Sequence, residues 1–114
     1  MVDTESRQKA KRIVQERGLG GLANDTKWGE FFALVQEQQI SMEVKLIYEE
    51  LSFQNSRVWS PVENYLECSR MGPVLFVFIE WVRSQATKEL QTIAVTVGLE
   101  CEVCDGRATV YGYR

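Results

Sequence analysis

The longest run of hydrophobic residues lies between residues 74 and 83, and it sets the first expectation about the fold. The run is rich in β-branched and aromatic residues, with Gly72-Pro73 before it and a polar segment after it. This pattern is typical of a strand that is buried on both faces at the centre of a sheet. Its unbroken apolar part, residues 74–79, is far shorter than the ~20 residues that a membrane-spanning helix needs, so we expect no membrane span.

A helix is predicted to begin at Asp25 or Thr26, either of which can cap it. Four large apolar residues then recur at helical spacing: Trp28, Phe31, Phe32 and Val35. Three aromatic side chains on one stripe have to cover an apolar surface, and we expect them to cover one face of the central strand.

Residues 87–97 carry two patterns at once. Leu90, Ile93, Ala94 and Val97 have helical spacing and Gly98 follows them, which favours a helix that ends at this glycine. The β-branched residues of the segment also alternate with its other residues, so a strand is the alternative interpretation.

Alternating polar and apolar residues predict a half-exposed strand over residues 42–49. Residues 51–56 are expected to form a loop. Residues 57–68 are expected to form a strand that is interrupted at Pro61, because proline lacks the N–H group that a central strand needs.

Asp105-Gly106 separates two strand-like runs, residues 100–104 and 107–113, and predicts a hairpin with a type I′ turn. Together the elements predict an α+β fold. We expect an antiparallel or mixed sheet of about four to five strands, with residues 74–83 as its central apolar strand and two or three helices covering it.

The beginning of the chain differs in charge from the rest. Residues 4–17 predict a helix with a thin apolar stripe. Residues 1–17 carry five basic and three acidic side chains, net +2, whereas residues 18–114 carry eight basic and thirteen acidic ones, net −5. We therefore expect a basic, loosely docked helix or arm over residues 1–17 and a single α+β domain over residues 18–114.

Composition narrows the possible chemistry. The chain has 114 residues, of which 45% are hydrophobic and 25% charged, enough for a globular domain with its own core. Its three cysteines do not suggest a secreted disulfide framework, and its first residues lack the apolar stretch of a signal peptide, so a cytoplasmic location is expected. It contains no histidine, which excludes Ser/His/Asp and Cys/His catalysis.

Cys101 and Cys104 are spaced like half of a zinc knuckle. A structural zinc site needs four ligands, and only Cys68 remains to join the pair, so neither a metal nor another cofactor is expected. The spacing should place Cys101 and Cys104 on opposite faces of a strand, as ordinary small side chains; a redox pair is the alternative.

Six residues are candidate contacts for a protein partner, because tyrosine and tryptophan beside carboxylates suit recognition. They are Trp59, Glu63, Tyr65, Glu67, Tyr111 and Tyr113. The aromatic residues among them could equally pack under the helices. Glu80 interrupts the apolar run, and we expect it to pair with an arginine such as Arg57 or Arg83.

Three short motifs occur along the chain: Thr26-Lys27-Trp28, Ile79-Glu80-Trp81, and residues 110–114, Val-Tyr-Gly-Tyr-Arg. With these motifs the chain resembles a set of small uncharacterised bacterial proteins over residues 26–114, and this resemblance implies no activity for individual residues. In size, acidity and absence of catalytic groups the chain is also similar, in type only, to bacterial immunity proteins.

The resulting hypothesis is a non-enzymatic protein-binding domain. Its most specific form is an immunity protein that occludes the active surface of a bacterial toxin. Many nuclease toxins are basic, and an acidic partner raises association rates and specificity. The alternative is a nucleic-acid-associated regulator that uses the basic N-terminal helix, with Arg7, Lys9, Lys11 and Arg12. The net charge of −3 and the lack of interleaved aromatic residues argue against nucleic acid, and an enzyme is the least favoured class.

Overall fold

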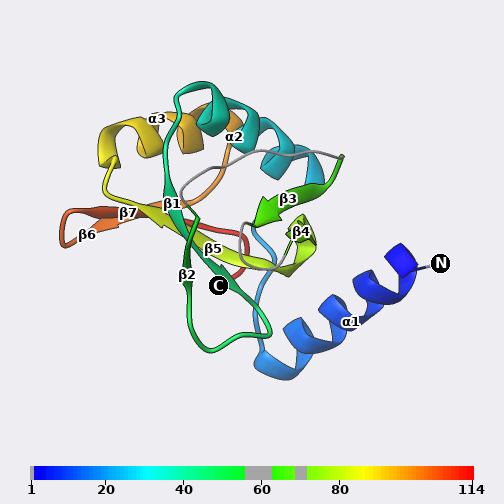
Figure 1. Cartoon of the computed structure of the whole chain (residues 1–114). Coiled ribbons are helices and arrows are strands. Elements are labelled where there is room, and N and C mark those ends of the chain that lie inside the picture. Colours follow the sequence, from blue (N-terminus) through cyan, green and yellow to red (C-terminus); the bar gives the residue numbers. More distant parts are fainter. Residues whose placement is uncertain (1, 56–62, 69–71) are drawn as a thin grey trace.

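The computed structural model describes residues 2–55, 63–68 and 72–114, and these residues form an α+β fold. The predicted fold class is confirmed: three helices accompany a five-stranded antiparallel sheet and a separate two-stranded sheet in the described residues (Figure 1). In chain order the elements are α1 (Val2–Arg17), α2 (Asp25–Glu37), β1 (Met42–Leu46), β2 (Phe53–Asn55), β3 (Tyr65–Cys68), β4 (Gly72–Leu75), the 3₁₀ turn η1 (Phe76–Phe78), β5 (Ile79–Ser84), α3 (Thr87–Val97), β6 (Cys101–Cys104) and β7 (Arg107–Tyr111).

The large sheet has the strand order β2-β1-β5-β7-β6, and the small sheet pairs β3 with β4. Helices α2 and α3 lie together on one face of the large sheet, whereas α1 lies on the other side of the molecule, near η1 (Figure 1). The core lies between the helix pair and the sheet. Its largest fully buried side chains include Phe31, Phe32, Phe76, Met42, Leu46, Ile79 and Leu90.

The predicted single strand over residues 74–83 is divided in the structure. Its first part belongs to β4 in the small sheet, η1 turns the chain, and its last part belongs to β5 in the large sheet. The turn keeps Phe76 in the core, with its ring centroid 5.4 Å from that of Phe32. Because a continuous apolar run only requires burial, a chain that bends around the core satisfies it as well as a straight strand.

β5 is the central strand of the large sheet, but only one of its faces is fully buried. Val82 points into the core, whereas Trp81 and Arg83 on the opposite face are half-buried. The expectation of a strand buried on both faces is therefore wrong for this segment.

A short strand was also missed. β2 lies inside the predicted loop of residues 51–56 and pairs with β1, with Phe53 opposite Val44. Phe53 and Asn55 are buried. Three residues are too short for a periodic pattern, so this strand depends on its pairing with β1 rather than on its own sequence.

Two further predictions are corrected by where α2 and β3 begin. The N-cap of α2 is Asn24 instead of Asp25 or Thr26; its side-chain oxygen accepts a 2.8 Å hydrogen bond from the Lys27 amide. Of the strand predicted over residues 57–68, only residues 65–68 form β3; residues 63–64 form a turn, and Pro61 lies outside the described residues.

Three local predictions are confirmed. Trp28, Phe31, Phe32 and Val35 are the buried residues of α2. Residues 87–97 form a helix, and Gly98 ends it in the left-handed conformation at φ 79°. Asp105 and Gly106 have φ of 54° and 74°, as the type I′ turn between β6 and β7 requires.

α1 contacts the rest of the molecule through several kinds of side chain. Ala10 is buried, and the Lys9 ammonium lies 5.7 Å from the centroid of the Tyr48 ring. Arg7 forms a 2.9 Å ion pair with Asp25 at the start of α2. After α1 the chain runs beside its own C-terminal residues, with a bridge between Gly21 and Tyr113.

We predict that Phe32→Ala lowers the free energy of unfolding by about 3–5 kcal/mol, because the substitution leaves a cavity among the rings of Trp28, Phe31 and Phe76. Urea unfolding followed by circular dichroism measures the change. Val95→Ala is the matched control, since Val95 is 79% exposed and should change stability by less than about 0.5 kcal/mol. Similar losses in both variants would contradict the packing described here.

Candidate functional site

The face of the large sheet that lies opposite α2 and α3 carries polar and aromatic side chains. Strand register places Trp81 on β5 directly between Lys45 on β1 and Tyr111 on β7. The neighbouring row joins Arg83 on β5 to Thr109 on β7. We call this surface the open face; its residues are Glu43, Lys45, Trp81, Arg83, Glu102, Thr109 and Tyr111.

Arg83 is fixed in position on the open face by two contacts. Its Cζ lies 4.2 Å from the centroid of the Trp81 ring, a cation–π stack. Its Nε donates a 2.9 Å hydrogen bond to the Thr109 hydroxyl, and Thr109 is only 5% exposed. These contacts restrict the rotamers of a side chain that is ordinarily flexible.

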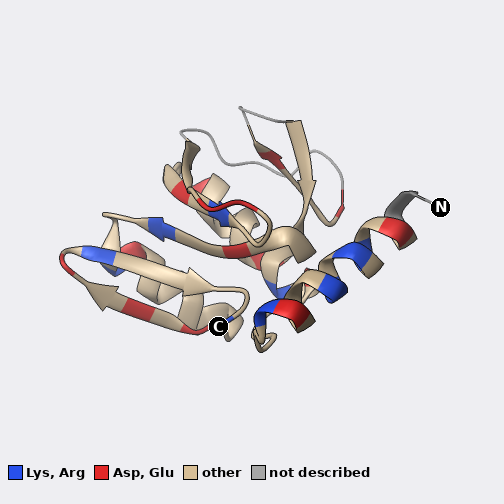
Figure 2. Cartoon of the chain, turned by 90° about the horizontal axis from the view of Figure 1, so that it is seen from below, with Lys and Arg blue, Asp and Glu red and all other residues tan. Residues whose placement is uncertain are grey.

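A second arginine covers Tyr111. The Arg114 Cζ lies 4.4 Å from the centroid of this ring, and its two terminal nitrogens donate 2.8 Å hydrogen bonds to Glu100 and Glu102. Hydrogen bonding from Arg114 lowers the pKa of Glu102. Burial and the Glu102 carboxylate raise the pKa of Tyr111. The open face thus carries charges of both signs (Figure 2).

The six predicted contact residues are divided between different surfaces. Glu63 is exposed in the turn before β3, and Tyr65 and Glu67 are half-buried on β3. Tyr111 lies on the open face of the other sheet, and Trp59 lies outside the described residues. The structure therefore brings Glu63, Tyr65 and Glu67 together but places Tyr111 on a separate sheet.

Tyr113 is directed into the molecule. Its hydroxyl donates a 2.8 Å hydrogen bond to the Val77 carbonyl in η1, and burial raises its pKa. It lines a cavity of about 20 Å³ together with Trp28 and Phe76. Tyr113 therefore packs inside the fold, which was the alternative to partner contact for the predicted aromatic residues.

Sequence reasoning missed Trp81 and Arg83 as surface residues. Their signal was the alternation with the buried residues Val82 and Ser84, which the apolar run in front of them concealed. An alternating end to a continuous apolar run indicates a strand with one open face.

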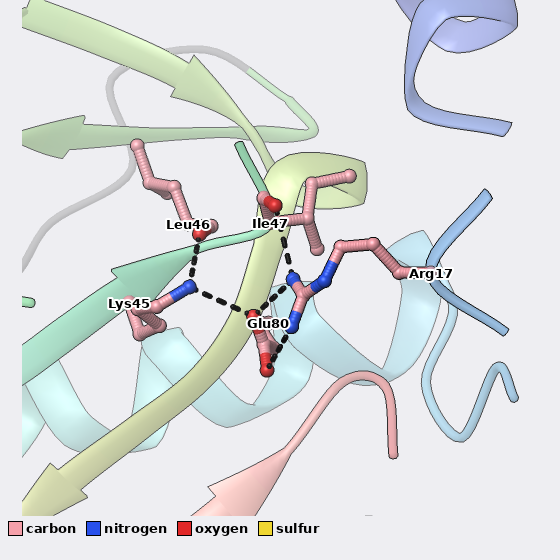
Figure 3. Close-up of polar contacts among 5 residues, drawn as sticks. All are labelled: Arg17, Lys45, Leu46, Ile47 and Glu80. Atoms are coloured by element: carbon pink, nitrogen blue, oxygen red, sulfur yellow. Dashed lines mark hydrogen bonds and ion pairs between the residues drawn. The ribbon is translucent and has the colours of Figure 1, made fainter. Parts of the chain in front are cut away.

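Glu80 lies at the centre of a second cluster of charged residues (Figure 3). The Nη1 and Nη2 atoms of Arg17 donate hydrogen bonds of 2.7 Å and 3.3 Å to the two Glu80 carboxylate oxygens. The Lys45 ammonium lies 2.9 Å from Oε1 of Glu80. Arg17 also donates to the Ile47 carbonyl at 3.0 Å, and Lys45 to the Leu46 carbonyl at 2.9 Å.

The expected arginine partner of Glu80 was a different one. Arg83 is stacked on Trp81 instead, and Arg57 lies outside the described residues. The actual partner, Arg17, comes from α1 and is 63 residues away along the chain, so no local pattern could indicate it.

The position of Glu80 depends on an irregularity in the sheet. β1 pairs Leu46 with Ile79 but Lys45 with Trp81, so Glu80 is an extra residue on β5. The backbone oxygen of Glu80 accepts hydrogen bonds from the amides of Gly112 and Tyr113, at 2.8 Å and 3.1 Å. We call Glu80 and these partners, with Arg17 and Lys45, the Glu80 junction.

The three short sequence motifs meet at this junction. A Cβ atom at Gly112 would lie 2.5 Å from the Ile79 carbonyl oxygen and 2.9 Å from Cζ2 of Trp28, so only glycine fits there without rearrangement. Gly112 also accepts hydrogen bonds from the amides of Leu22 and Ala23. The motifs therefore mark the contact between the start of α2, β5 and the C-terminal residues.

Electrostatics at the Glu80 junction favour the ionised form of the carboxylate. Burial acts to raise the pKa of Glu80, but the hydrogen bonds and charges of Arg17 and Lys45 outweigh it, and the pKa is lowered. The pKa of Arg17 is raised by its hydrogen bond to Glu80. A carboxyl group held ionised in this way stabilises structure and is poorly suited to act as a general acid near neutral pH.

Two of the three cysteines have surroundings that disfavour the reactive thiolate form. Burial raises the pKa of Cys68 to about 12 and also raises that of Cys101, which disfavours the thiolate. Cys104 is exposed on β6. Within residues 2–55, 63–68 and 72–114, no cluster of three or more potential metal ligands occurs.

The fold and the open face define a small α+β protein with a mixed-charge, aromatic sheet surface. The chain belongs to the family of unknown function DUF6678, whose family model matches residues 10–114. The match includes the open face and the Glu80 junction. No curated protein and no solved structure matches the chain. None of the helices in the described residues is long and apolar enough to cross a membrane.

We predict that Glu80→Gln lowers the free energy of unfolding by about 1–3 kcal/mol at pH 7, because the variant loses its charge-assisted hydrogen bonds. The folded-state pKa of Glu80 is lowered from 4.5, so its stabilisation is present above the unfolded pKa and is lost as the pH falls through the folded pKa. Urea unfolding between pH 7 and strongly acidic pH measures the difference.

The difference between Glu80→Gln and the unmodified chain should therefore shrink toward acidic pH. Glu30→Gln, a change at an exposed position of α2, is the control and should have little effect at any pH. A loss of stability that does not depend on pH would show that the charge of Glu80 does not contribute.

Proposed function

We propose that this chain is a non-enzymatic protein-binding domain whose partner packs on the open face. The observation that carries the proposal is the direct cross-strand pair of Trp81 and Tyr111, each ring stacked with an arginine. Tryptophan, tyrosine and arginine are the residues that most often dominate the binding energy of protein interfaces. Here they share one surface, on the side of the sheet away from α2 and α3.

The preorganisation of this surface supports the proposal. Arg83 and Arg114 are each held by a ring and by hydrogen bonds, so little side-chain entropy remains to be lost on binding. The shifted pKa values also lie further from neutral pH: the pKa values of Glu80 and Glu102 are lowered, and those of Tyr111 and Cys68 are raised. Such shifts favour binding and structure over proton transfer at neutral pH.

An immunity protein is the more specific form of this proposal. In that form the partner is a toxin domain whose active surface the open face occludes. The net charge of −5 over residues 18–114 supports steering toward a basic partner, because opposite charges raise the association rate. The mixed charges of the open face itself would then supply specificity.

The alternative, a regulator that binds nucleic acid through α1, has less support. Arg7 pairs with Asp25, Lys9 stacks on Tyr48, and Arg17 pairs with Glu80. Three of the five basic side chains of α1 therefore already have partners inside the molecule. Lys11 and Arg12 remain exposed.

The test is affinity capture of a partner by the tagged full chain from a lysate of its own host, at low and high salt. We predict that Trp81→Ser and Tyr111→Ser each weaken retention of the partner at least about 30-fold, as expected for hot-spot residues. Val95→Ser is the matched control, because it changes an exposed apolar residue on the helical side of the molecule.

Equal retention by Trp81→Ser and Val95→Ser would contradict the open face as the binding surface. Loss of the partner in Tyr65→Ser alone would place the surface on β3, with Glu63 and Glu67. Recovery of nucleic acid that is lost at high salt, or in a Lys11→Gln/Arg12→Gln variant, would favour the regulator instead.

A further inference from the structure

A cavity of about 600 Å³ opens at the edge of the open face. It lies where β1 begins, β5 ends and β7 begins, between the end of α2 and the start of α3. Its lining is mostly polar. The residues that matter here are Glu43, Gln54, Arg83, Gln85, Glu89 and Arg107.

Arg83 is the charged group of this cavity that is fixed in position and still has unused hydrogen-bond donors. Its Nε is bonded to Thr109 and its guanidinium plane is stacked on Trp81. In the described part of the chain, its two terminal nitrogens form no hydrogen bond or ion pair. A guanidinium that is fixed in place with both terminal nitrogens available is a receptor for a planar oxyanion.

Of the other charges of the cavity, Glu43 is engaged. Its carboxylate accepts a hydrogen bond from the Ser52 hydroxyl and lies 4.0 Å from Nη1 of Arg107. Glu89 is exposed at the rim, in the first turn of α3. The cavity therefore holds two arginines beside two carboxylates; Arg83 is held in place by a ring stack and a hydrogen bond, whereas Arg107 is more exposed and has only a 4.0 Å contact with Glu43.

We propose that this cavity binds a single carboxylate group of a peptide segment of the partner, with the Arg83 guanidinium donating two parallel hydrogen bonds to its oxygens. A singly charged, planar carboxylate matches the guanidinium fork, whereas a phosphate dianion would be repelled more strongly by Glu43 and Glu89. The glutamine amides of the lining can bond to the peptide backbone around the carboxylate.

This inference rests on the proposed function, because it gives the chemistry of the partner segment that reaches the edge of the open face. The carboxylate can be an acidic side chain or a chain terminus, since the two present the same group to Arg83. The experiment below separates these two sources.

The test is a titration of the ¹⁵N-labelled full chain, followed by NMR, with four probes. The first is an acetylated, amidated pentapeptide that has one glutamate among glutamines. The second is an all-glutamine pentapeptide with a free C-terminus, the third is the same peptide amidated, and the fourth is inorganic phosphate. We expect saturable shifts of the Arg83 side-chain N–H and of the Ser84 and Gln85 amides with a carboxylate probe but not with the amidated all-glutamine peptide.

Four variants make the test specific to Arg83. Arg83→Gln and Arg83→Lys should each weaken binding at least about tenfold, because neither offers the guanidinium fork. Arg12→Gln is the matched control, since it removes an exposed arginine of α1 outside the cavity, and it should leave binding unchanged. Glu89→Gln should strengthen binding by about twofold to fivefold.

Shifts that are equal for the carboxylate and amidated probes, or unchanged in Arg83→Gln, would overturn the inference, and so would tighter binding of phosphate than of either carboxylate. The proposed function is tested by a separate result, the capture experiment. If the Trp81→Ser variant loses the captured partner while no carboxylate probe binds, the open face stands and only the carboxylate site is refuted.

Discussion

The Glu80 carboxylate, held between Arg17 and Lys45, is the interaction on which the arrangement of the molecule depends (Figure 3). The side chain of Glu80 holds the end of α1, through Arg17, and the end of β1, through Lys45. Its backbone oxygen holds the C-terminal residues. A half-buried charge is costly unless it is paired, so these segments are held together by a requirement of electrostatics as well as by packing.

The open face follows from this arrangement. Since α1 is held at the η1 end of the molecule, it lies beside the large sheet instead of across the surface opposite α2 and α3 (Figure 1). The rings of Trp81 and Tyr111 lie on that surface, each stacked with an arginine side chain. The two faces of the large sheet therefore differ: one completes the core, and the other carries the aromatic and charged groups on which we propose that a partner packs.

The sequence predicted those parts of the fold that local signals determine: the aromatic stripe of α2, the glycine stop after α3 and the Asp105-Gly106 turn. It did not reveal how residues 74–83 are shared between two sheets or that β2 exists, because both depend on pairing with distant strands. The candidate site shows the same division. Tyr111 was among the predicted contacts. Arg83 was not, because its side chain is held in position by a hydrogen bond to Thr109, which is 26 residues away along the chain.

The most direct test of this account is hydrogen exchange of the Gly112 and Tyr113 amides, which bond to the Glu80 carbonyl oxygen. The account predicts that both amides are protected to the same degree as the amides of β5. It also predicts that Arg17→Gln, which removes a partner of Glu80, lowers their protection more than that of α3. Rapid exchange of Gly112 and Tyr113 in the unmodified chain, or protection that Arg17→Gln leaves unchanged, would contradict the central role of the Glu80 junction.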